Sequence, residues 1–148
     1  MTVDILLVED NPNDAELAML ALRRARFSGE ITHAEDGLEA FRILGLGEGG
    51  STEGRLPLVV LLDLKLPKVD GLQVLEKIKT DARTHSVPVV MLTSSQERSD
   101  VETAYRLGVN SYVVRPVNFD EYQTALASLA NYWTRLNEPC LATSGDGV

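Results

Sequence analysis

Short apolar runs alternate along the chain with segments whose apolar residues recur every three or four positions. The most continuous run covers 58–62, between Pro57 and the carboxylate of Asp63. An unbroken apolar run of this length is typical of a strand buried on both faces, as in a parallel sheet. The same reasoning predicts four further strands, over 3–8, 31–34, 88–92 and 111–114.

Five helical patterns follow these strands, and their ends carry recognisable signals. Pro12 favours the start of the first helix, and Asp36 is predicted to cap the second, with Glu39 completing a capping box. The last pattern predicts one helix over 119–136. Residues 45–57 include five glycines and are predicted to form a long loop.

The alternation of five strands with five helices predicts an α/β fold with helices on both faces of a parallel sheet. Right-handed crossovers reduce the possible topologies to a doubly wound arrangement. We predict a flavodoxin-like, five-stranded parallel sheet in the order 2-1-3-4-5 with five helices. The length of 148 residues suits a single domain.

Charge and composition limit the possible partners. The formal net charge is −8, which disfavours binding to a nucleic-acid backbone. No apolar run approaches the roughly 20 residues that span a bilayer, and no basic segment precedes an apolar core at the N-terminus. Cys140 has no second cysteine to pair with, which fits a reducing environment. We therefore expect a cytoplasmic protein that binds neither nucleic acid nor membrane.

Polar side chains follow four of the predicted strands: Glu9 and Asp10, Asp63, Thr93 and Arg115. Each has an ordinary interpretation as a helix cap or a solvated charge, but parallel strands would bring all five to one sheet edge. Converging carboxylates require a cation, and oxygen ligands suit Mg²⁺. A hydroxyl and a fixed positive charge suit phosphoryl oxygens, while Asp63 can act as a nucleophile.

Several segments together resemble the CheY-like receiver domain of bacterial two-component response regulators. They are 4–10, 34–40, 63–71, 88–93 and 112–116, in this order and spacing. The resemblance covers a predicted receiver domain over 3–136, followed by a tail over 137–148 that is a candidate interaction arm.

The resemblance implies that Asp63 accepts a phosphoryl group from a sensor histidine kinase. It also implies a Mg²⁺ site, where Mn²⁺ can substitute, formed by Glu9, Asp10, Asp63 and the backbone carbonyl of Lys65, with Glu9 acting through water. Such a protein is a phosphoacceptor rather than an enzyme. With no output domain expected after the receiver, it would signal by contacts with an unknown downstream protein.

Three further residues match switch positions of the family. Thr93 would contact the phosphoryl group, and Tyr112 would be the aromatic residue whose rotamer reports it. Arg115 stands where the family usually has lysine, and the exchange is not conservative at a close phosphate contact. We expect Arg115 to pair with the phosphoryl group or with Asp63. The family usually has a cis peptide before the proline that matches Pro116.

Within the family, the chain is similar to the single-domain regulators paired with bacterial phytochromes. The similarity lies in 63–71, in 88–119 and in the aromatic pair Tyr132 and Trp133. It implies a phytochrome kinase as the phosphoryl donor. Tyr132, Trp133 and Leu136 also extend the apolar stripe of the last helix beyond the length a compact domain needs, which predicts a partner surface for a homodimer.

Three other functions are compatible with this fold class. A pseudo-receiver would dock to partners without taking phosphate, and Arg115 mildly favours that interpretation, whereas the retained acids and Thr93 oppose it. A flavin-binding electron carrier would need a hydroxyl-rich phosphate loop where this chain has Glu9 and Asp10. A Mg²⁺-dependent phosphohydrolase would need a second acid where this chain has Lys65.

Overall fold

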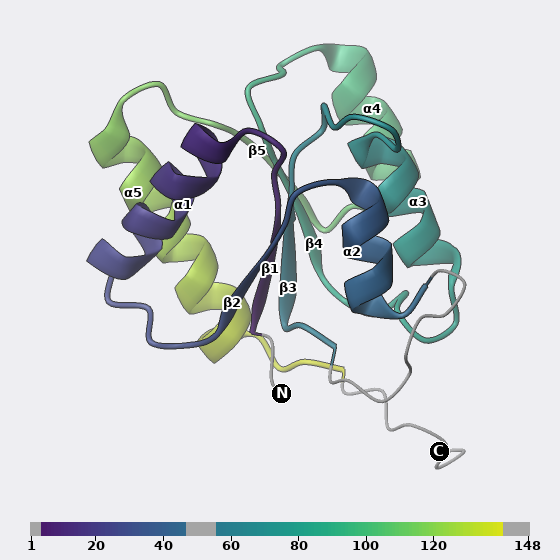
Figure 1. The fold of residues 1–148 in the computed structure, drawn as a ribbon, viewed down its shortest axis with the longest axis horizontal. Helices are drawn as coiled ribbons and strands as arrows, with labels where there is room; N and C mark the ends of the chain where they lie inside the picture. Colours follow the sequence, from purple (N-terminus) through teal and green to yellow (C-terminus); the bar gives the residue numbers. More distant parts are fainter. Residues whose placement is uncertain (1–3, 47–55, 141–148) are drawn as a thin grey trace.

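Five parallel strands form one sheet in the order β2-β1-β3-β4-β5, as predicted (Figure 1). The strands are β1 (Ile5–Val8), β2 (Ile31–Ala34), β3 (Val59–Leu62), β4 (Val89–Thr93) and β5 (Ser111–Val114). The computed structural model describes residues 4–46 and 56–140. Most of the predicted loop over 45–57 and of the tail after residue 136 therefore lies outside the described residues.

The register of the strands aligns their carboxyl ends. Val8 of β1 lies between Ala34 of β2 and Leu62 of β3, and Thr93 of β4 is paired with Val114 of β5. The residues that follow these positions consequently meet at one edge of the sheet. This is the upper edge in Figure 1.

Helices cover both faces of the sheet (Figure 1). One face carries α1 (Pro12–Arg24) and α5 (Phe119–Asn131), and the other carries α2 (Gly37–Leu44), α3 (Gly71–Thr80) and α4 (Arg98–Arg106). Side chains of the central strands alternate between two apolar clusters, because successive residues of a strand point to opposite faces. Val60 and Leu62 pack on the α2–α4 side, whereas Val59 and Leu61 pack on the α1–α5 side.

Side-chain caps fix where several helices begin. Asn11 caps α1 by accepting hydrogen bonds from the backbone N–H groups of Asn13 and Asp14. Asp36 caps α2 as predicted, with its carboxylate accepting from the Glu39 N–H. A reciprocal capping box forms at α3 between Asp70 and Gln73.

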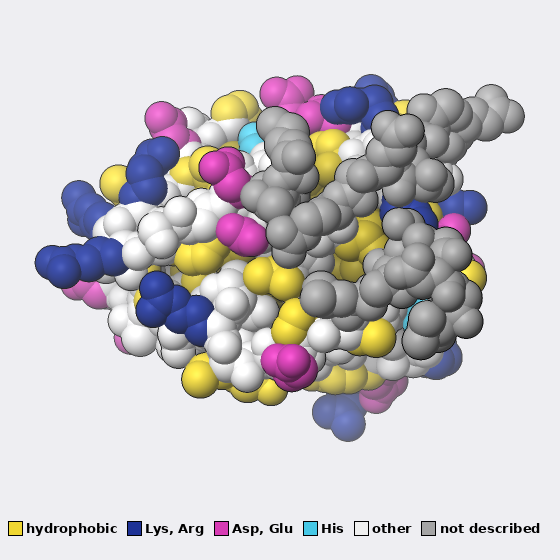
Figure 2. Space-filling view, turned by 90° about the horizontal axis from the view of Figure 1, so that it is seen from below, with side chains coloured by type: hydrophobic (Ala, Val, Ile, Leu, Met, Phe, Trp, Pro, Cys, Tyr) yellow, Lys and Arg dark blue, Asp and Glu magenta, His cyan; other side chains and the backbone are white. Residues whose placement is uncertain are grey.

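The opposite ends of the helices lie on the face shown in Figure 2. Arg23 and Arg24 occupy the last turn of α1, where cations interact favourably with the helix dipole. Basic side chains project at the corresponding left edge of Figure 2. No helix among residues 4–46 and 56–140 is long and apolar enough to cross a membrane.

The predicted helix over 119–136 is divided, which corrects the expectation of one regular helix. After α5 the chain widens into a π-helical turn, η1 (Tyr132–Leu136), and the Asn137 N–H donates to the Tyr132 carbonyl. Trp133 packs against the apolar cluster shared by α1 and α5, with its ring edge-on to that of Tyr132. Tyr132 and Leu136 remain 47% and 68% exposed. The predicted partner surface is therefore only partly free, because Trp133 packs on its own domain.

Candidate functional site

The carboxyl edge of the sheet brings the predicted acids together. Glu9 and Asp10 follow β1, and Asp63 follows β3. One carboxylate oxygen from each of these residues lies within 4.8 Å of those of the other two. Glu9 is buried, Asp63 is half-buried and Asp10 is exposed. The cluster is thus closed on the protein side and open to solvent beside Asp10.

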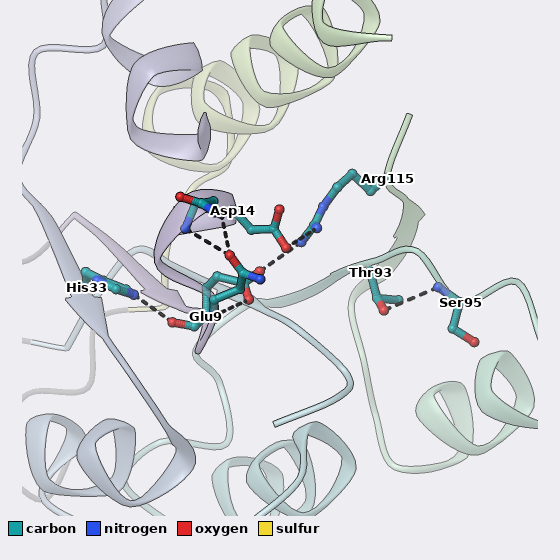
Figure 3. Close-up of polar contacts among 8 residues, drawn as sticks. Glu9, Asp14, His33, Thr93, Ser95 and Arg115 are labelled. Carbon is teal, nitrogen blue, oxygen red and sulfur yellow. Dashed lines mark hydrogen bonds and ion pairs between the residues drawn. The ribbon is translucent and has the colours of Figure 1, made fainter. Parts of the chain in front are cut away.

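Both oxygens of Glu9 are already engaged (Figure 3). Its Oε2 accepts a hydrogen bond of 3.1 Å from the Asn11 N–H, and its Oε1 pairs with Nη2 of Arg115 at 2.9 Å. The backbone carbonyl of Glu9 lies 2.7 Å from Nε2 of His33 on β2. These contacts tie the end of β1 to the end of β5 and to the edge strand β2.

The cluster disfavours negative charge. Burial, together with the charge on Asp63, raises the pKa of Glu9 to about 7, against the effects of the Asn11 N–H and Arg115, which lower it. Burial also raises the pKa of Asp63, although Arg115 and the Thr93 hydroxyl lower it. Two neighbouring carboxyl groups with raised pKa values require either a proton or a cation between them.

The donor set fits a divalent cation that prefers oxygen. Glu9, Asp10 and Asp63 offer three carboxylates, and the exposure of Asp10 leaves room for water and for phosphate oxygens. No ion pair involves Asp10 or Asp63 within the described ranges, so their charges are left for an external cation. Lys65, two residues beyond Asp63, has an exposed side chain.

The end of β4 supplies the hydroxyl side of the site. Thr93 is buried, and its Oγ1 accepts from the Ser95 N–H at 3.4 Å. The Ser95 hydroxyl donates to Asp100 on α4, and the Ser95 carbonyl accepts from the hydroxyl of Tyr112 at 2.9 Å. The two predicted switch residues, Thr93 and Tyr112, are thereby connected through Ser95.

Arg115 lies at the site but makes different contacts from those expected. Its guanidinium pairs with Glu9 and with Asp14, and no ion pair with Asp63 occurs in the described part of the chain (Figure 3). The expected pairing with Asp63 is therefore not seen in this structure, where the guanidinium contacts the carboxylates of Glu9 and Asp14. Pairing with a phosphoryl group stays a prediction.

The peptide before Pro116 is trans, since residues 4–46 and 56–140 contain no cis peptide. This corrects the expected cis bond, and trans is the lower-energy isomer of such bonds.

Two neighbours of Arg115 were missed by the sequence reasoning. Asp14 pairs with the guanidinium from the first turn of α1, and the ring of Tyr122 on α5 lies 5.8 Å from the Arg115 guanidinium carbon. Asp14 lies in the first turn of α1, but nothing in the sequence marks it as a partner of Arg115. Nothing in the local sequence points from Arg115 to Tyr122.

One protein family matches most of this chain. The response regulator receiver domain family matches residues 5–127. This chain belongs to that family. The order of the strands and the acids at the carboxyl edge agree with the membership, so the receiver resemblance and the flavodoxin-like fold are confirmed.

Individual relatives resemble nearly the whole chain. The bacteriophytochrome response regulator RtBRR is 48% identical, with a TM-score of 0.72 over 94% of this chain and 84% of that chain. The probable methanogenesis regulatory protein FilR2 of Methanothrix harundinacea is 44% identical over 133 residues, 90% of this chain and 84% of the relative. The receiver thus resembles regulators that serve different pathways.

Rcp1 adds a metal-bound relative. Response regulator Rcp1 of Synechocystis sp. is 35% identical over 129 residues, which is 87% of each chain. A crystal structure of the Mn²⁺-bound form of response regulator Rcp1 superposes with a TM-score of 0.81 at 33% identity, over 95% of this chain and 99% of that chain. A receiver of similar sequence therefore accepts a divalent cation.

Proposed function

We propose that this receiver takes a phosphoryl group from a sensor histidine kinase on Asp63 and signals through protein contacts. The observation that carries the proposal is the carboxylate of Asp63 at the end of β3, half-buried with a raised pKa, beside Glu9, Asp10 and Thr93. A divalent cation held by the three carboxylates and the Lys65 carbonyl supplies positive charge for the phosphoryl oxygens when it is bound.

The transfer is a displacement at phosphorus. A carboxylate oxygen of Asp63 attacks the phosphorus of a phosphohistidine, the P–O bond forms as the P–N bond breaks, and the leaving imidazole nitrogen retains the electron pair and takes up a proton. Thr93 would donate its hydroxyl to the incoming group. Burial raises the pKa of Asp63, and a cation bound beside it would lower that pKa again. The cation would therefore favour the ionised carboxylate, which is the nucleophile.

Labelling with acetyl phosphate tests this assignment without a kinase. Wild type should be labelled in Mg²⁺ and not in excess chelator, and Asp63→Asn should lose the label. Glu35→Gln is a matched control, because Glu35 is an exposed acid after β2 on the same sheet edge and outside the cluster. Undiminished labelling of Asp63→Asn would remove Asp63 from the proposal.

The similarity to the bacteriophytochrome response regulator RtBRR supports a phytochrome kinase as the donor. We expect phosphotransfer from such a kinase to be faster than from unrelated sensor kinases at equal concentrations. Equal rates from all kinases would leave the receiver function intact but contradict the phytochrome pairing.

The apolar side chains at the end of the last helix support a homodimer. Tyr132 and Leu136 are exposed next to Trp133, and large exposed apolar side chains that lie together often mark a contact surface. Figure 2 shows further hydrophobic side chains on the face opposite the carboxyl edge. Sedimentation of wild type and of Tyr132→Ala/Leu136→Ala should give a dimer and a monomer. A monomeric wild type at tens of micromolar, phosphorylated or not, would contradict the dimer.

A further inference from the structure

The guanidinium of Arg115 lies between two carboxylates that come from different elements (Figure 3). Its Nη2 is 2.9 Å from Oε1 of Glu9, and its Nη1 is 3.2 Å from Oδ2 of Asp14. Glu9 follows β1 and belongs to the acidic cluster, whereas Asp14 lies in the first turn of α1 and outside the cluster. The Arg115 guanidinium thus joins Glu9, a candidate metal ligand, to Asp14, a carboxylate with no assigned role.

The surroundings of Arg115 make these two contacts important. Its side chain is only 20% exposed, and its Nε is buried without a hydrogen-bond partner. The ring of Tyr122 lies 5.8 Å from the guanidinium carbon, and the backbone N–H of Arg115 donates to the Thr93 carbonyl. A half-buried guanidinium that loses its only carboxylate partner is strongly disfavoured. The two carboxylates therefore determine the position of the Arg115 guanidinium.

Arg115 and a divalent cation would both draw on the charge of the Glu9 carboxylate. The cation would be held by Glu9, Asp10 and Asp63, and the same Glu9 now neutralises Arg115. If Glu9 were the only carboxylate within reach of Arg115, metal binding would leave the guanidinium unpaired. The Asp14 carboxylate can still pair with Arg115 when Glu9 interacts with the metal.

We propose that Asp14 is a positioning residue that holds Arg115 while Mg²⁺ takes up Glu9, so that Arg115 competes less strongly with the metal. This inference rests on the proposed function, because it assumes a Mg²⁺ site at the cluster. It also gives a reason for arginine at this position. A planar guanidinium can bridge two carboxylates through two separate nitrogens, which the single ammonium of lysine does less well.

Mg²⁺ affinity measured by titration calorimetry with MgCl₂ tests the inference. Asp14→Asn should weaken Mg²⁺ binding by about three- to tenfold, since Arg115 is left with Glu9 alone. Arg115→Gln should tighten it, because the competitor is removed. In the Arg115→Gln background, Asp14→Asn should change the Mg²⁺ affinity by less than about twofold. In the Arg115→Lys background, Asp14→Asn should weaken Mg²⁺ binding less than it does in wild type.

Two controls separate positioning from charge and folding. Glu16→Gln removes one exposed acid from the same helix without a contact to Arg115 and should leave the affinity within about twofold in both backgrounds. Asp14→Glu keeps the charge and should return the affinity toward wild type. Cooperative thermal unfolding of each variant shows that the fold is retained.

The outcomes distinguish this inference from the proposed function. Equal weakening by Asp14→Asn with and without Arg115, or no weakening in wild type, overturns the role of Asp14 and leaves the metal site standing. A wild type that does not bind Mg²⁺ overturns both.

Discussion

Protonation of Glu9 should control how strongly the protein binds Mg²⁺. Metal ligands must be deprotonated, and the Glu9 carboxyl, buried beside Asp63, has a pKa of about 7 instead of the ordinary value of 4.5. Roughly nine-tenths of Glu9 is then protonated at pH 6 and roughly one-tenth at pH 8. The apparent Mg²⁺ affinity should therefore fall roughly tenfold from pH 8 to pH 6, and Asp63 acts in the same direction.

The same shift predicts the direction of the pH effect on stability. Because the pKa of Glu9 is raised in the folded protein, protonated Glu9 contributes to the stability of the fold. This contribution is fully present below pH 4.5 and is lost as the pH rises through about 7. The free energy of unfolding lost over this pH range is about 3 kcal/mol at most in the metal-free protein. Saturating Mg²⁺ should reduce this loss, because the cation replaces the proton.

Calorimetry in buffers of different ionisation enthalpy measures the protons released on binding. Wild type should release roughly one proton per Mg²⁺ at pH 6 and roughly one-tenth of a proton at pH 8. Glu9→Gln should bind Mg²⁺ more weakly, with most of the proton release abolished, whereas Glu35→Gln should behave like wild type. A wild type whose affinity is the same at pH 6 and pH 8, with no proton release, would refute the reasoning.

Three further predictions follow from local structure. Gly71→Ala should lower the free energy of unfolding by about 1–3 kcal/mol in urea titrations, because a Cβ would overlap the backbone carbonyl oxygen of Asp63; an unchanged midpoint would contradict that contact. Leu61→Ala should cost about 2–5 kcal/mol, since the side chain is buried in the sheet, whereas Leu38→Ala, half exposed, should cost far less. Lys65→Asn should speed the loss of phosphate from the phosphorylated protein, because a long cation near the acceptor obstructs the attacking water; an equal half-life would count against this role.

The sheet was predictable because its strands carry their own signal. The run over 58–62 is apolar on both faces, and β3 occupies Val59–Leu62. Alternation and crossover handedness, which are properties of the whole chain, predicted a doubly wound sheet. The order 2-1-3-4-5 was chosen among the doubly wound orders, and the structure confirms it. The end of α5 was not predictable in the same way. It continues into the π-helical turn η1, where Trp133 packs against the apolar cluster shared by α1 and α5, and the three- and four-residue spacing of the apolar residues does not signal such a turn.

The candidate site was predictable to the extent that its residues directly follow strands. Glu9, Asp10 and Asp63 were predicted to lie together, and the structure places them together because parallel strands share one carboxyl edge. The partner of Arg115 was not predictable, since several carboxylates lie within reach of a long side chain. The choice of Asp14 depends on the capped start of α1, which sets the orientation of its first turn toward β5.

Phosphotransfer from a labelled sensor kinase to this protein tests the central claim most directly. The autophosphorylated kinase is mixed with wild type, Asp63→Asn or Glu35→Gln in Mg²⁺, and the label is then located by peptide mapping. We predict that the label leaves the kinase and appears on the peptide containing Asp63 in wild type and Glu35→Gln, and that Asp63→Asn takes none. Transfer to Asp63→Asn at the wild-type rate, or label on a different peptide, would contradict the assignment of Asp63 as the acceptor.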